Sequence, residues 1–209
     1  MPVAQPGLIF IAIAILFTGM LFYFGWMRFA WISLALTGFI IWFFRDPDRD
    51  VPKDEKGLIS PADGKVIVIE KQSGCEYLAG PCTKVSIFMN VFNVHVNRVP
   101  FDGMVQKIQY TPGKFINASF DKASVHNERN ALIVRTPGEA EYAVVQIAGL
   151  IARRIVNCVK EREKITKGDR YGMIRFGSRL DLYLPADFDV AGHMGEKTKA
   201  GSTIIGYMK

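Results

Sequence analysis

The most informative stretch of the chain is YGMIRFGSRLDLYLP, residues 171–185. From Arg179 onward, charged and apolar residues alternate, which predicts a half-buried β-strand headed by the pair Gly177-Ser178. A serine hydroxyl in this position can attack the preceding carbonyl carbon, convert the amide into an ester and so cut the chain. Gly177 suits such a cleavage because a residue without Cβ tolerates a strained backbone and leaves its carbonyl accessible. Most Gly-Ser pairs are ordinary turns, so the rest of the chain must decide between the two interpretations.

Residues 45–209 have the pattern of a β-rich domain. Short apolar runs are separated by glycine and proline, and the best candidate strands are 65–70, 84–91, 131–136, 142–148, 174–184 and 203–208. The segments 115–123 and 152–160 fit a helix and a strand equally well. The sequence therefore predicts a mainly β (α+β) fold, a compact β-sandwich or barrel-like domain with few helices.

Residues 1–44 have a different character and predict a membrane anchor. Residues 8–25 and 29–44 carry no charge, and only Trp26-Met27-Arg28 separates them. The first run is close to the roughly 20 apolar residues that span a bilayer, and the second is shorter. A cleaved signal peptide fits poorly, since no basic segment precedes the first run and no small-residue cleavage site ends it. A helical hairpin and a shallow wedge in the membrane plane both remain open.

The charges lie almost entirely in the second part of the chain. All 20 acidic residues, and all of the 26 basic residues except Arg28, follow residue 44. Arg45, Arg49 and Lys53 come directly after the second apolar run, which predicts that the domain lies on the cytoplasmic side of the cell (inner) membrane. The positive surplus suits contact with anionic lipid headgroups, although ordinary solubility explains it as well. Basic runs with interleaved aromatic residues are missing, so nucleic acid is not an expected partner.

Few residues offer metal or nucleophilic chemistry. Cys75, Cys82 and Cys158 form no CxxC pair, so we expect reduced thiols and no metal site. His95, within FNVHVNRVP, and Asp63, within the turn SPADG, are each ordinary on their own. Together with Ser178 they supply a hydroxyl nucleophile, an imidazole base and a carboxylate that could orient the base.

Seven motifs occur together in one order, and they resemble the short form of phosphatidylserine decarboxylase from about residue 43 to the C-terminus. They are FFRDP (43–47), SPADG (60–64), FNVHVNR (92–98), PGKF (112–115), DKAS (121–124), NERN (127–130) and IRFGSR (174–179).

The resemblance implies an enzyme that is made as a proenzyme. It would cut itself between Gly177 and Ser178 into a β chain, 1–177, and an α chain, 178–209, which stay associated. Ser178 would become an N-terminal pyruvoyl group, which forms a Schiff base with the amine of membrane phosphatidylserine and leads to phosphatidylethanolamine and CO2. The resemblance requires no metal and no diffusible cofactor. It leaves the oligomeric state open, a homo-oligomer included.

In one respect the chain departs from longer members of the family. They carry a second histidine three residues after the position of His95, where this chain has Arg98. His95 must therefore serve the self-cleavage, the decarboxylation or both. Arg98, Lys114 and Arg129 are candidate partners for the lipid phosphate or carboxylate.

Other groups could compete for these roles. We expect His126 and His193 to be incidental, and Gly201-Ser202 to be a turn rather than the cleavage point, since cutting there frees only a short tail. Archaetidylserine, an ether lipid with the same headgroup, is an alternative substrate. A membrane-anchored carrier or adaptor without catalytic activity is an alternative of another class.

Overall fold

The structure is a computed structural model that describes residues 3–114, 116, 118, 126–149, 154–175 and 177–209. The chain divides into two units, residues 1–48 and 49–209.

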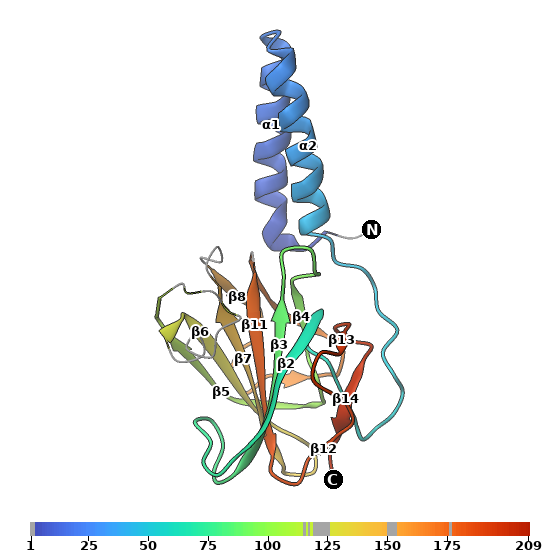
Figure 1. Cartoon of the computed structure of the whole chain (residues 1–209), viewed down its shortest axis with the longest axis vertical. Helices are drawn as coiled ribbons and strands as arrows, with labels where there is room; N and C mark the ends of the chain where they lie inside the picture. Colours follow the sequence, from blue (N-terminus) through green and yellow to red (C-terminus); the bar gives the residue numbers. More distant parts are fainter. Residues whose placement is uncertain (1–2, 115, 117, 119–125, 150–153, 176) are drawn as a thin grey trace. The chain divides into compact units, whose positions relative to one another are not determined.

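The first unit is a helical hairpin, in which the two apolar runs of the sequence form one helix each. The 3₁₀ turn η1 (Gln5–Gly7) leads into α1 (Leu8–Tyr23), and α2 (Met27–Phe43) returns beside it (Figure 1). Gly25 turns the chain with φ +73°, a conformation that glycine adopts without steric cost. At the open end, the backbone N–H of Ala4 donates to the carbonyl of Phe44 at 2.9 Å.

The polar groups of the hairpin face one another between the helices. The Thr18 hydroxyl lies 2.7 Å from Ser33 Oγ and 3.0 Å from Thr37 Oγ1, and Thr37 also donates to the Ser33 carbonyl at 2.8 Å. Large apolar side chains cover the outside, and the segment Gln5–Tyr23 is long and apolar enough to cross a membrane. A hairpin with its hydroxyls satisfied inside and hydrocarbon outside suits a membrane anchor.

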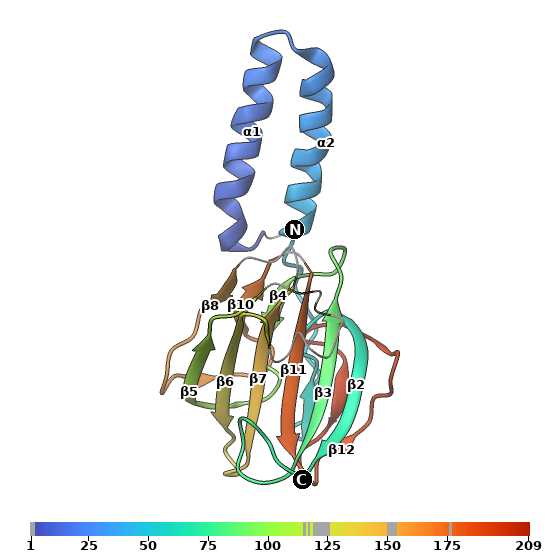
Figure 2. The same cartoon turned by 60° about the vertical axis from the view of Figure 1, so that its left-hand side comes forward.

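The second unit is built on an eight-stranded antiparallel sheet with the order β13-β2-β3-β11-β7-β6-β5-β9 (Figure 2). Two three-stranded sheets, β1-β14-β12 and β4-β10-β8, complete it. The strands are β1 (Gly57–Ile59), β2 (Gly64–Gln72), β3 (Cys82–Met89), β4 (Val96–Arg98), β5 (Gly103–Thr111), β6 (Arg129–Arg135), β7 (Glu141–Ala148), β8 (Ile155–Asn157), β9 (Lys164–Ile165), β10 (Arg170–Ile174), β11 (Ser178–Pro185), β12 (Asp189–Val190), β13 (Lys197–Thr198) and β14 (Ile204–Tyr207).

The mainly β fold is confirmed, and most of the predicted strands are present. Strands β2, β3, β6, β7 and β14 lie within two residues of the predicted bounds. The predicted strand 174–184 is wrong as one element. Strand β10 ends at Ile174, a new strand, β11, begins at Ser178, and the two strands belong to different sheets. Strand β5 was missed, since a register shift between Val105 and Lys107 interrupts its alternation.

Two segments fit a helix and a strand equally well in the sequence. Of these, 115–123 lies largely outside the described residues. Within 152–160 the structure has the short strand β8, which is extended.

Strand β11 is buried on both faces, so the prediction of a half-buried strand is wrong. Leu180, Leu182 and Leu184 enter the main core on one face. On the other face Arg179 and Asp181 are fully buried, and Tyr183 packs against Tyr77 from the loop between β2 and β3. The loop covers Tyr183 on this face, a contact that the sequence pattern of β11 alone cannot reveal.

The buried charges of β11 neutralise one another. Arg179 Nε contacts Asp181 Oδ1 at 2.6 Å, and Arg179 Nη2 donates to Ser86 Oγ at 2.8 Å. Lys84 Nζ lies 3.6 Å from Asp181 Oδ2. Ions that are removed from water are tolerated where they are paired, as Arg179 and Asp181 are here, although Asp181 Oδ2 has the ion pair with Lys84 and no hydrogen bond of its own within the described part of the chain.

Candidate active site

Ser178 begins the central strand of the large sheet. It lies opposite Met89 of β3 and Ala148 of β7, and it has no exposed surface. Cross-strand neighbours in an antiparallel sheet point to the same side, so Ser178 faces the main core together with Met89. Two paired neighbours fix the residue much more firmly than a loop position would.

Gly177 carries the carbonyl that Ser178 would attack. Its φ is +70°, in the left-handed region that favours glycine, and an added Cβ would meet nothing within 4 Å. The requirement for glycine at this position is therefore conformational rather than steric. The backbone N–H of Gly177 donates to His95 Nε2 at 3.3 Å, which brings the histidine to the predicted cleavage point.

A second glycine, which the sequence analysis missed, lies against the same carbonyl. A Cβ at Gly149 would stand 2.1 Å from the Gly177 oxygen and 2.9 Å from its carbonyl carbon. The chain therefore needs a residue without a side chain at Gly149 for the carbonyl to hold its present position. The only sign in the sequence is that Gly149 directly follows the predicted strand 142–148.

His95 is fully buried and is hydrogen-bonded through both ring nitrogens. Its Nδ1 lies 2.9 Å from the Asn93 carbonyl oxygen, an acceptor only, so Nδ1 carries the proton. Nε2 then has a lone pair, in agreement with the N–H that it accepts from Gly177. The Asn93 carbonyl is itself fixed, because Asn93 closes a tight turn with Asn90.

Asp63 does not occupy the position that the predicted triad would give it. Its carboxylate accepts hydrogen bonds from Arg49 Nη2 at 2.9 and 3.1 Å and from the Ala200 N–H at 2.8 Å. The neighbouring carbonyl of Pro61 accepts the Arg98 N–H at 2.9 Å. Asp63 is thus tied to the turn on which the segment after His95 is docked, while the His95 ring is oriented by Asn93.

The three candidate cations do not share one place. Arg98 is buried and donates to the Gly168 carbonyl at 2.9 Å, whereas the Lys114 side chain is exposed. Arg129 lies opposite Ile147, which lies opposite Arg179, so it is on the face of the sheet away from Ser178.

Arg129 is held by the loop between β2 and β3. Its Nε donates to Tyr77 Oη and its Nη2 to Glu76 Oε1, each at 3.1 Å. Burial is the main cause that raises the pKa of Tyr77 to about 12, so this phenol is protonated at neutral pH.

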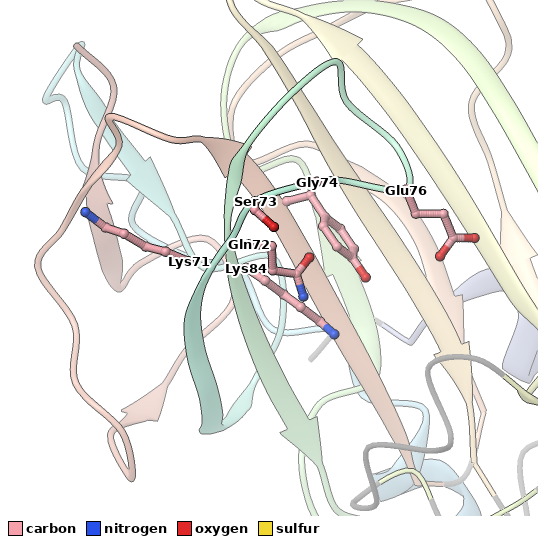
Figure 3. Close-up of a pocket in the computed structure, with 7 residues that line it drawn as sticks. Lys71, Gln72, Ser73, Gly74, Glu76 and Lys84 are labelled. Atoms are coloured by element: carbon pink, nitrogen blue, oxygen red, sulfur yellow. The ribbon is translucent and has the colours of Figure 1, made fainter.

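A polar cavity of about 500 Å³ opens beside this loop, at the far end of β11 (Figure 3). It is lined by Lys71, Gln72, Ser73, Gly74, Glu76, Lys84 and Tyr183. Tyr183 is about 17 Å along the strand from Ser178, at about 3.4 Å per residue. The cavity is therefore separate from the predicted cleavage point.

The remaining candidates lie elsewhere. His126 and His193 are exposed, and His193 lies 3.4 Å from Glu196. Ser202 belongs to a turn, where its N–H donates to the Lys199 carbonyl at 3.2 Å. Among the described residues, no three His, Cys, Asp or Glu side chains are grouped to hold a metal ion.

Comparison with known proteins agrees with the motifs. The family model of phosphatidylserine decarboxylase matches residues 36–206. The chain belongs to the phosphatidylserine decarboxylase family. The family consists of carboxy-lyases, so the alternative of a carrier or adaptor without catalytic activity is wrong.

Several relatives are similar over almost their whole length, and each is named phosphatidylserine decarboxylase proenzyme. The relative from Syntrophus aciditrophicus (strain SB) is 54% identical over 85% of this chain and 84% of its own. The relative from Desulfotalea psychrophila is 48% identical over 98% of this chain and 96% of its own. The relative from Magnetococcus marinus is 46% identical over 99% of this chain and 95% of its own.

Proposed function

We propose that this chain is a self-cleaving proenzyme that decarboxylates phosphatidylserine to phosphatidylethanolamine, with a pyruvoyl group derived from Ser178 as its cofactor. One observation carries the proposal beyond family membership. The Gly177-Ser178 bond lies at the head of the central strand, and the lone pair of His95 Nε2 faces the amide of Gly177 at 3.3 Å.

The cleavage begins at the Ser178 hydroxyl. Its Oγ bonds to the Gly177 carbonyl carbon while His95 Nε2 takes the hydroxyl proton, and the C–N bond then breaks as that proton passes to the nitrogen of residue 178. The resulting ester eliminates when a base removes the Cα proton, so that Gly177 leaves with a carboxylate and residue 178 is left as dehydroalanine. Water replaces its nitrogen, ammonia departs, and a ketone with a methyl group remains. No oxidant or reductant is needed.

The surroundings of residue 178 fit a pyruvoyl group. The position is closed to solvent, Met89 offers a thioether and Ala148 a methyl group, and none of these requires a hydroxyl on residue 178. The ketone would supply an electron-withdrawing carbonyl that takes the substrate amine and stabilises the negative charge left by CO2. His95, already directed at this point, is our candidate to move protons in either reaction.

Asp63 and the candidate cations take supporting roles in this proposal. Asp63 fixes the turn that binds the backbone of Arg98, three residues after His95, and so acts as a positioning residue. Lys114, with its exposed side chain, is the candidate to meet the lipid headgroup. The contacts of Arg98 with Gly168 and of Arg129 with Glu76 and Tyr77 favour structural roles for both arginines.

We propose that the helical hairpin anchors the enzyme in the cell membrane with its catalytic unit on the cytoplasmic side. The 19 residues of Gln5–Tyr23 extend about 28 Å at 1.5 Å per residue, close to the hydrocarbon thickness of about 30 Å. Arg45, Arg49 and Lys53 follow the hairpin, and basic residues prefer the cytoplasmic side.

Mass spectrometry of the purified protein tests the cleavage. We expect two chains, 1–177 and 178–209, with a blocked N-terminus on the smaller one. Ser178→Ala should remain one inactive chain, whereas the matched control Ser202→Ala should be cut normally. A single intact chain in active wild-type enzyme would refute the proposal.

The substrate is tested separately with the cleaved enzyme. CO2 release is measured from phosphatidylserine vesicles, from vesicles of the ether-linked serine lipid and from free serine, across a salt series. We expect turnover of the vesicle lipids that weakens with salt, since basic residues near an anionic surface each contribute about 1 kcal/mol. Comparable turnover of free serine would contradict a lipid substrate.

A further inference from the structure

The Ser178 hydroxyl and its candidate base do not face each other. Ser178 Oγ donates to the thioether of Met89, with an Oγ–Sδ distance of 3.3 Å, while His95 Nε2 accepts the N–H of Gly177. A serine hydroxyl has one proton, which it donates to one acceptor at a time. Before His95 can take this proton, the hydroxyl must turn away from Met89.

A buried chain of side-chain amides fixes Met89. Asn97 Nδ2 lies 3.8 Å from the same sulfur, and Asn97 Oδ1 accepts from Gln146 Nε2 at 2.9 Å. Gln146 Oε1 in turn accepts from Asn130 Nδ2 at 3.4 Å. Asn97 and Gln146 are fully buried and Asn130 nearly so. Since each amide is satisfied by its neighbour, the thioether is fixed in place rather than loosely packed.

The chemistry of a thioether suits both states of residue 178. Sulfur is a weak hydrogen-bond acceptor, so it can orient a hydroxyl without holding it strongly. After cleavage the side chain of residue 178 is a methyl group, and a thioether packs against a methyl group as a polarisable apolar neighbour. A stronger acceptor in this buried place would lose its donor, at a cost in free energy.

We propose that Met89 is a positioning residue that holds the Ser178 hydroxyl away from His95 in the precursor, and so slows self-cleavage. In the cleaved enzyme Met89 provides the apolar wall against the methyl group of residue 178. The proposal rests on the self-cleavage at Gly177-Ser178 described above. It predicts that removal of the acceptor speeds maturation, an effect that damage to the core would not produce.

The test follows cleavage of freshly translated full-length chain by intact mass. Met89→Leu keeps an apolar side chain of similar size and removes the acceptor, so it should cleave about two- to tenfold faster than wild type, the range expected for one lost hydrogen bond. Met89→Gln offers a stronger acceptor and should cleave more slowly. Met208→Leu, also in the main core, is the matched control and should cleave at the wild-type rate.

The cleavage rates of the Met89 variants decide whether Met89 restrains the Ser178 hydroxyl. Met89→Leu cleaving no faster than wild type, with an unchanged melting temperature in a Ser178→Ala background, would overturn the proposal. Should Met89→Leu fail to fold, Met89→Gln decides, since cleavage at or above the wild-type rate would also overturn it. Once cleaved, Met89→Gln should have a lower kcat than Met89→Leu, and the reverse order would refute the role as an apolar wall. If wild type itself is never cut, the proposed function fails and not the role of Met89 alone.

Discussion

Gly149→Ala is the sharpest perturbation that the site offers, because it places one methyl group against the scissile carbonyl. The new Cβ would lie 2.1 Å from the Gly177 oxygen, whereas real Cβ contacts essentially never fall below 3.0 Å. The carbonyl or its neighbour must therefore move by at least about 0.9 Å. Overpacking of this kind costs about 1–3 kcal/mol of stability, and a misplacement of about 1 Å at a reacting group slows a reaction about 10²-fold.

We therefore expect Gly149→Ala to fold and to cleave about 100-fold more slowly than wild type. Intact mass at successive times after translation gives the rate, and thermal unfolding gives the stability. Gly74→Ala is the matched control, because a Cβ there meets nothing within 4 Å. If Gly149→Ala cleaves at the rate of Gly74→Ala, the carbonyl is not held as the structure indicates, and the reasoning is refuted.

Three further results are expected. His95→Ala should slow cleavage about 10²–10⁴-fold in the intact-mass assay, because general-base assistance has this size, while His193→Ala should cleave normally. Asp181→Ala should lower the free energy of unfolding by about 3–5 kcal/mol, because it leaves the buried Arg179 without the carboxylate that pairs with it. Urea denaturation measures this change, and a loss below about 1 kcal/mol would contradict the expectation. Burial raises the pKa of the Cys82 thiol to about 12, so little thiolate exists at pH 8. Iodoacetamide should therefore label Cys82 only after denaturation, and rapid labelling of the folded protein would show that the thiol is accessible.

Local patterns in the sequence were enough to predict most strands, the helical segments and the family of this protein. The short apolar runs between glycine and proline predicted β2, β3, β6, β7 and β14 within two residues, because these signals lie within and beside each strand itself. The apolar runs predicted the helical segments, and the ordered motifs led to the family. The predicted cleavage residue Ser178 also begins a strand, as a motif at a strand head suggests.

Contacts between distant segments decided the rest. Arg179 and Asp181 are buried among partners from β3, Ser86 and Lys84, so β11 is not half-buried. The pairing of β11 with β3 also sets Met89 against Ser178 from 89 positions away. Asp63 is bound by Arg49 and Ala200, which no turn pattern indicates, and Gly149 meets the Gly177 carbonyl only because β7 and β11 are neighbours. Sequence periodicity reports which face of a strand is apolar, whereas strand order and register determine what lies against that face.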